Sequence, residues 1–199
     1  MFHTVILGFH KIVGLYNLPA KKKKFHDAFL FKLFLIFLLG AKAAATVDIL
    51  SHLIPSNRKV KKGNKFTRIS FEESKRSILL YVANAGQVED ILKEREVRLK
   101  KEGLTRQPII IYQGLKSESP EAVYVCLEEI KYTFDNFLEA FDIAFKLHFA
   151  LDLRYSVESD QIWLLVQKVL YEIPIPEEID LSNKLRTILP KFNQKERQT

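Results

Sequence analysis

One histidine and one aspartate in the C-terminal half of the chain have the spacing of an acid–base pair. His148 lies four residues before Asp152, so both side chains would share one helix face and could act together in proton transfer. Phe145 and Phe149 flank the histidine, however, and a single histidine on an apolar helix is usually a packed residue with one hydrogen-bond partner. We therefore favour a packing role for His148.

Three carboxylates have the spacing of a second kind of site. Asp135, Glu139 and Asp142 lie at i, i+4 and i+7, which aligns them along one side of a helix where they could hold a hard cation. No second acidic helix is matched to supply the six or more oxygen ligands that calcium prefers, so a solvated helix face is the better interpretation.

The single cysteine, Cys126, has no histidine near it in the sequence and lies in a predicted strand, which argues against a nucleophilic thiolate. No glycine follows Gly114, so the last 85 residues contain no glycine-rich loop for phosphate binding. We accordingly expect no catalytic residue, no metal and no cofactor, and we interpret the protein as not an enzyme.

The positive charge of the chain is concentrated in its first third. Residues 1–68 carry 13 Lys and Arg against two Asp and Glu, whereas residues 69–199 have a net charge of −4. Residues 57–65 read NRKVKKGNK, which predicts a linker, and no aromatic residue interleaves that cluster, so base stacking is not indicated there. The predicted contacts to nucleic acid or phosphate are Arg58, Lys59, Lys61, Lys62, Lys65 and Arg68.

An apolar segment precedes this basic stretch. Four lysines at 21–24 are followed by a strongly apolar run, and residues 28–47 reach the length of a membrane span only by including Lys32 and Lys42. Three interpretations stay open: a helix of the soluble protein that ends before Pro55, a membrane anchor at residues 28–45, or a signal-like segment. The lone cysteine favours a reducing, intracellular location, cytoplasmic or nuclear, with membrane association or secretion as the alternatives.

The elements that would position these residues begin at Ser70, which forms a capping box with Glu73. Phe71, Ile78, Val82 and Ala85 recur near helical spacing and predict a helix that ends at Gly86. A second helix is predicted over residues 88–99 and is closed by Gly103. The run at 109–112 is typical of a central strand that is buried on both faces.

The remaining pattern predicts a hairpin followed by helices. Residues 122–127 and 130–134 read as its two strands, and Asn136 caps a largely buried helix to about residue 153. Further helices are predicted at 160–171 and from Ser182 to Pro190. The fold class is therefore α+β, with a small, mainly antiparallel, three-stranded sheet and four to five helices. The predicted domain is residues 70–190, between a basic N-terminal region at 1–69 and a polar tail at 191–199.

Two aromatic residues beside the helix at 160–171 are candidates for contact with a partner. Tyr155 and Trp163 either complete the core or project as anchors for another protein. The first role is favoured, but both stay open.

Several segments resemble the C-terminal region of a large, poorly characterised and multi-copy group of invertebrate proteins. The resemblance rests on QPIIIYQG at 107–114, FLEAFDIAFKLHFAL at 137–151 and IWLLVQKVLYEI at 162–173, and it covers roughly residues 75–173. It implies spread by mobile elements or lineage expansion and no established activity.

Our first functional hypothesis is a noncatalytic protein interaction domain whose residual apolar surface serves a partner or a second copy. The alternatives are a nucleic-acid-associated protein of mobile-element origin, which binds phosphates through its basic arm, and a membrane-anchored protein.

Overall fold

The structure is a computed structural model that describes residues 43–115 and 119–193. The α-helices of these ranges are α3 Ala43–Leu53, α4 Phe71–Arg76, α5 Val88–Glu102, α6 Phe137–Ala150, α7 Asp160–Val169 and α8 Asn183–Asn193, with a 3₁₀ turn at Ala85–Gln87. The strands are β1 Lys59–Lys62, β2 Lys65–Arg68, β3 Leu79–Val82, β4 Ile109–Gln113, β5 Ala122–Leu127 and β6 Ile130–Phe134. The predicted α+β class is confirmed.

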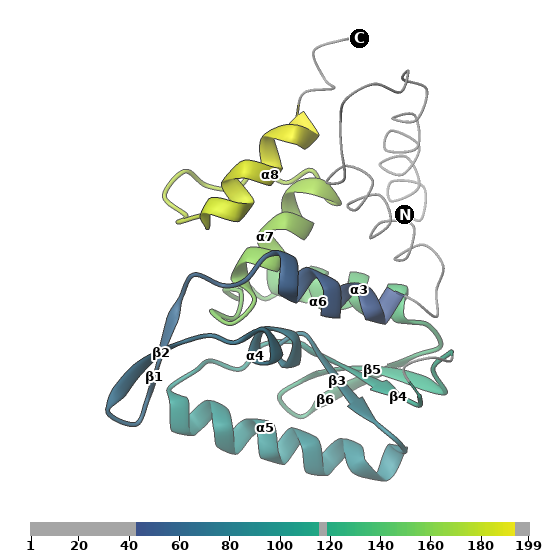
Figure 1. Cartoon of the computed structure of the whole chain (residues 1–199). Helices are drawn as coiled ribbons and strands as arrows, with labels where there is room; N and C mark the ends of the chain where they lie inside the picture. Colours follow the sequence, from purple (N-terminus) through teal and green to yellow (C-terminus); the bar gives the residue numbers. More distant parts are fainter. Residues whose placement is uncertain (1–42, 116–118, 194–199) are drawn as a thin grey trace, which may run out of the picture.

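The main sheet has four strands rather than the predicted three, in the order β3-β4-β5-β6. Strand β3 runs parallel to β4, whereas β5 runs antiparallel to both of its neighbours, β4 and β6. Helix α5 connects β3 to β4 and covers one face of the sheet, while α3, α4 and α6 lie over the other (Figure 1). The predicted hairpin of β5 and β6 is confirmed, and β4 is central, as expected.

Strand β3 is the element that the helical interpretation of residues 70–86 missed. The capping box of Ser70 and Glu73 is present, but α4 ends at Arg76 and the chain then extends through the apolar run Ile78–Val82. A short apolar run cannot be assigned to helix or strand by periodicity alone. Pairing with β4 decides the matter, because it places Leu79 and Leu80 on opposite, buried faces of the sheet.

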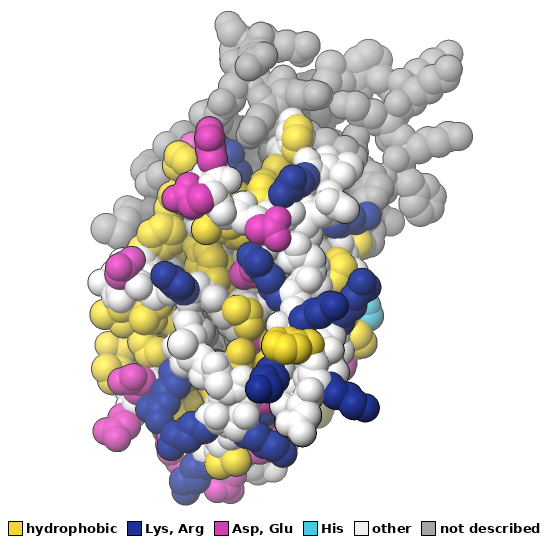
Figure 2. Space-filling view, turned by 90° about the vertical axis from the view of Figure 1, so that its left-hand side faces the viewer, with side chains coloured by type: hydrophobic (Ala, Val, Ile, Leu, Met, Phe, Trp, Pro, Cys, Tyr) yellow, Lys and Arg dark blue, Asp and Glu magenta, His cyan; other side chains and the backbone are white. Residues whose placement is uncertain are grey.

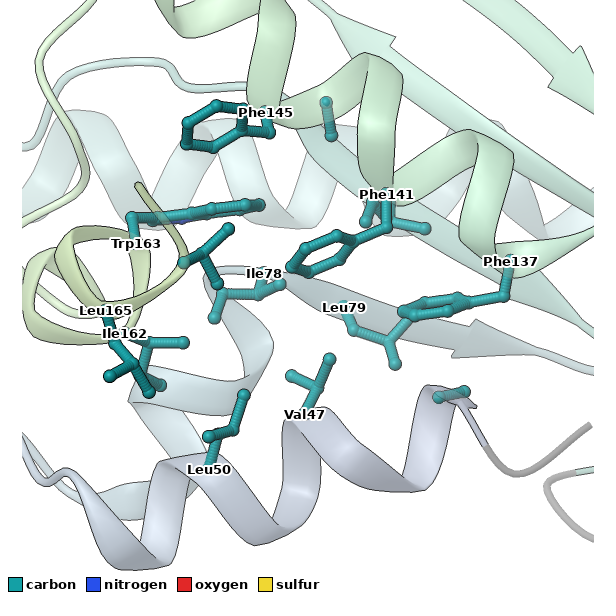
Figure 3. Close-up of a cluster of buried hydrophobic side chains, with 14 of the residues drawn as sticks. Val47, Leu50, Ile78, Leu79, Phe137, Phe141, Phe145, Ile162, Trp163 and Leu165 are labelled. Atoms are coloured by element: carbon teal, nitrogen blue, oxygen red, sulfur yellow. The ribbon is translucent and has the colours of Figure 1, made fainter. Parts of the chain in front are cut away.

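The larger core lies between the sheet and the helices of the upper layer. Phe137, Phe141 and Phe145 of α6 point toward Trp163 of α7 and toward the sheet (Figure 3). Helix α3 belongs to the same core, since its side chains Ala44, Val47 and Leu50, together with Ile54, are buried in it. The compact unit therefore begins N-terminal of the predicted boundary at Ser70.

A smaller core fills the space under α5. Leu80, Ile109, Ile111 and Cys126 from the sheet pack with Val88 at the start of α5. Gly103 ends this helix in the left-handed conformation, with φ of 64°, so the predicted glycine stop is confirmed.

The C-terminal helices form where they were predicted, but their first and last residues differ from the predicted ones by a few positions. Asn136 caps α6 by accepting a hydrogen bond from the backbone N–H of Glu139 at 2.9 Å, and Ser182 accepts one from Leu185 at 3.2 Å before α8. Pro190 does not end α8, which continues to Asn193. Proline removes one N–H near the end of the helix, and the final turn still forms.

The apolar segment at 28–45 and the tail at 191–199 lie mostly outside the described residues. Only residues 43–45 of the first belong to the structure, where they open α3, and residues 191–193 of the second end α8. Among the helices of residues 43–115 and 119–193, none is long and apolar enough to cross a bilayer.

Candidate nucleic-acid interface

The segment predicted as a linker is a β-hairpin. Strands β1 and β2 pair antiparallel, with Lys62 opposite Lys65, so that only Gly63 and Asn64 form the turn. Gly63 has φ of 60°, the conformation that the first central residue of a type II′ turn requires and that glycine adopts without strain. The Gly-Asn pair between two short alternating segments is the signal that would have predicted this hairpin.

Alternation along the strands divides the hairpin into two faces. Val60 and Thr67 are opposite each other and share the inner face, where Val60 is buried and β1 packs against α5. Lys62 and Lys65 lie on the same side, at the turn. The inner face thus holds the hairpin to the body of the protein.

The outer face carries three cations and one aromatic ring. Lys59 lies opposite Arg68, and Lys61 lies opposite Phe66. All four side chains are exposed, and Phe66 retains 70% of its accessible surface. No aromatic residue interleaves the cluster at 57–65, but Phe66 directly follows it, and the strand register places its ring beside these cations.

The six predicted phosphate contacts fall into two groups. Arg58 donates to Asp160 at 3.1 Å and lies 3.7 Å from Asp180, and Lys62 forms an ion pair with Glu73. These two cations are engaged within the fold. For Lys59, Lys61, Lys65 and Arg68 there is no ion pair with any described residue.

The engaged pair at the turn also ties the hairpin to α4. Burial acts to raise the pKa of Glu73, but the Lys62 ammonium and the backbone and hydroxyl groups of Ser70 outweigh it and hold that pKa below its ordinary value. Glu73 therefore stays ionised and fixes one end of the ribbon.

Figure 2 looks onto the hairpin side of the molecule, the left-hand side of Figure 1. Lys and Arg side chains, drawn dark blue, are spread over much of its lower half. The basic residues at 58–68 therefore belong to a hairpin that packs on the compact unit and are not part of a free arm.

His148 lies in the core, 3% exposed, with its ring 5.1 Å from that of Trp163 and 4.9 Å from that of Tyr155. Its Nδ1–H donates to the carbonyl oxygen of Ala144 at 2.9 Å, and its Nε2 is buried without a partner in the described ranges. Asp152 follows the end of α6 and is exposed. The predicted packing role accounts for these contacts, and the acid–base pair does not form.

Acid should destabilise the fold through His148. Burial lowers its pKa from 6.5 to about 4, so the folded state requires the neutral ring while the unfolded chain binds a proton below about pH 6.5. Stability is therefore complete above that pH and lost as the pH falls toward 4, and the expected loss at pH 5 is about 2 kcal/mol relative to pH 7.5. Urea unfolding at both pH values measures it.

His148→Phe is the matched control, because it retains a planar ring and cannot titrate. Between the two pH values, the free energy of unfolding of this variant should fall by about 2 kcal/mol less than that of the wild type. Equal pH dependence in the two proteins would contradict this origin.

Two of the three carboxylates that were considered as a cation site, Glu139 and Asp142, have structural roles in α6. Glu139 lies at the capped start of the helix, and Asp142 accepts a hydrogen bond from the Tyr171 hydroxyl at 2.7 Å and pairs with Lys146. No group of three metal-ligating side chains occurs within the described part of the chain.

The Cys126 thiol is buried, and burial raises its pKa to about 11, which disfavours the thiolate.

The two aromatic candidates for partner contact are both parts of the core. Trp163 is 1% exposed, and Tyr155 packs against the same cluster and donates through its hydroxyl to Gln167 Oε1 at 2.9 Å. The alternative in which Trp163 projects as an anchor is therefore wrong. Trp163 lies beside the predicted apolar stripe of its helix, and its ring packs against Phe141 and Phe145 of α6.

No protein-family model, curated protein or solved structure matches this chain. The resemblance to the multi-copy invertebrate group therefore stays a prediction.

Proposed function

We propose that this protein is a noncatalytic nucleic-acid-binding protein that contacts single strands through the outer face of the β1–β2 hairpin. The observation that carries the proposal is the combination of Lys59, Lys61 and Arg68 with an exposed Phe66 on one side of a two-stranded ribbon. Cations that track a phosphate backbone and an aromatic side chain on which a base stacks are the two components of sequence-tolerant single-strand binding.

The charge pattern within the hairpin supports a polyanionic ligand. On the outer face Lys59 is directly opposite Arg68, although like charges at such positions destabilise an antiparallel pair. Phosphates lying across the ribbon would remove that repulsion. Binding of a phosphate would then be favoured in part because it removes a repulsion between side chains that is present in the free protein.

The test is the salt dependence of binding to a fluorescent, single-stranded oligonucleotide, measured by anisotropy. We expect the triple variant Lys59→Gln, Lys61→Gln, Arg68→Gln to lower the slope of log K against log salt by about 2, from roughly 0.7 per lost contact. The matched control replaces three lysines outside the hairpin by glutamine, each exposed or half-exposed and each on a helix: Lys93, Lys168 and Lys184. It should leave the slope unchanged.

Equal slopes for the two triple variants would show that only overall charge matters and would contradict the proposal. So would absence of binding by the wild type at low salt. Preferential binding to phosphatidylserine vesicles would instead assign the basic face to a membrane surface.

Phe66→Ala separates single strands from duplexes. Loss of one stacked base is worth about 1–3 kcal/mol, so affinity for the single strand should fall by about 5- to 150-fold while duplex binding changes little. Phe66→Tyr keeps the ring and should bind like the wild type. An equal loss for both ligands would exclude stacking as the role of this ring.

The interaction-domain hypothesis stays a prediction beside this one. Its two named contacts, Tyr155 and Trp163, no longer support it, because they belong to the core. Residual apolar surface does occur elsewhere, on strand β6.

A further inference from the structure

Strand β6 is an edge of the main sheet and is open on its outer side. It pairs with β5 alone, and none of its backbone groups bonds to any other described segment. An edge with free N–H and C=O groups is a template for another strand unless it is protected.

The side chains of β6 alternate between the two faces of the sheet. Tyr132 and Phe134 are opposite Val125 and Val123, both of the larger core, so Ile130, Tyr132 and Phe134 lie on the α6 side. Phe134 is half-buried, but Ile130 is 55% exposed and Tyr132 47% exposed. The edge therefore presents an apolar strip beyond the part of the sheet that α6 covers.

The opposite side of the strand carries polar groups. Lys131 and Thr133 are both exposed, Lys131 lies 3.4 Å from Glu89 of α5, and the exposed Asp135 directly follows the strand in a bend. A cation and a carboxylate thus lie four residues apart with a threonine midway between them. This arrangement is complementary to itself when the strand is reversed.

We propose that two copies of this chain pair through β6, antiparallel, about a two-fold axis at Thr133. In that register Lys131 of each copy is opposite Asp135 of the other, and Tyr132 is opposite Phe134 of the other. Opposite charges and aromatic pairs directly across an antiparallel pair are the stabilising combinations. Two four-stranded sheets would become one continuous sheet of eight.

The neighbouring symmetric registers are less favourable. An axis at Tyr132 places Glu129 opposite Asp135, and an axis at Lys131 places that lysine opposite its own copy. A shift by a single residue mixes the apolar and polar faces. Of these three registers, the axis at Thr133 alone pairs unlike charges and keeps the apolar side chains together.

The first test is sedimentation velocity of the full chain without nucleic acid, from about 5 to 500 µM, because one strand pair buries less than a standard interface of about 1,200 Å² and the dimer should be concentration-dependent. Lys131→Glu or Asp135→Lys alone creates two like-charge contacts and should raise the dimer dissociation constant about tenfold. The double variant, and an equimolar mixture of the two single variants, should restore dimers.

A wild type that is monomeric over the whole range, or single variants that dimerise like the wild type, would overturn the proposal. Failure of the mixture to restore dimers would overturn this register. Circular dichroism confirms that each variant is folded.

A cysteine cross-link tests the axis directly. Thr133→Cys places two thiols opposite each other, within the distance of a disulfide, whereas Lys131→Cys leaves the thiols four residues out of register. The native Cys126 is buried and does not compete. Under mild oxidation we expect a cross-linked dimer for Thr133→Cys and at least tenfold less for Lys131→Cys. Equal yields would contradict the axis at Thr133.

Discussion

Replacement of Trp163 by alanine is expected to lower the free energy of unfolding by about 3–5 kcal/mol, the range measured for large aromatic truncations in cores. The indole is 1% exposed, and its ring lies 5.1 Å from that of Phe141 and 6.3 Å from that of Phe145. Because a domain of this size is stable by only about 5–15 kcal/mol, the variant should be at the margin of folding.

Urea unfolding followed by far-UV circular dichroism measures this effect, since the variant loses the only tryptophan of the chain. Trp163→Phe is the control, because it retains an aromatic ring and leaves a smaller cavity. It should cost clearly less than the alanine. A loss of under about 1 kcal/mol for Trp163→Ala would show that the core closes without the indole.

The second large effect is expected at the ion pair between α5 and the loop before α7. Arg98 donates to Glu158 through two nitrogens, at 2.7 and 3.2 Å, and Glu158 is only 2% exposed. Its hydrogen bond to Glu158 raises the pKa of Arg98, despite the opposing effect of burial. Arg98→Met should cost about 3–5 kcal/mol, because it leaves a buried carboxylate without its counter-ion.

The control for this prediction is the double variant Arg98→Met, Glu158→Met. Removing both charges also removes the penalty of an unpaired one, so the double variant should be more stable than Arg98→Met by several kcal/mol. Thermal unfolding at pH 7 compares the two. A double variant less stable than the single one would mean that packing of the arginine, rather than its charge, stabilises this contact.

The sequence predicted those elements whose stabilising interactions are local. The cap at Asn136, the stop at Gly103 and the hairpin at 122–134 are specified by residues within a few positions of each other, and all three are confirmed. Strand β3 depends on β4, about thirty residues away, and its apolar run had no feature of its own that excluded a helix.

The candidate site was predicted in part, for a related reason. The basic residues were evident from composition, but which of them are free depends on distant carboxylates. Arg58 is engaged by Asp160 and Asp180, which lie more than a hundred residues further along the chain. The proposed role of Phe66 depends on the hairpin register, which places the ring opposite Lys61. Pairing across the turn, and not composition, therefore determines which side chains the proposed interface contains.

The larger core draws on both ends of the described chain, from Ala44 and Val47 of α3 to Ile188 and Leu189 of α8. During ribosomal synthesis, at about 5–20 residues per second, the interval between these segments takes on the order of ten seconds. The sheet is complete at Phe134, so for the last several seconds of that interval its strands have been made while α7 and α8 are still incomplete. A nascent chain thus exposes an apolar surface until α7 and α8 are made, and we expect chaperones that hold such surfaces to bind it.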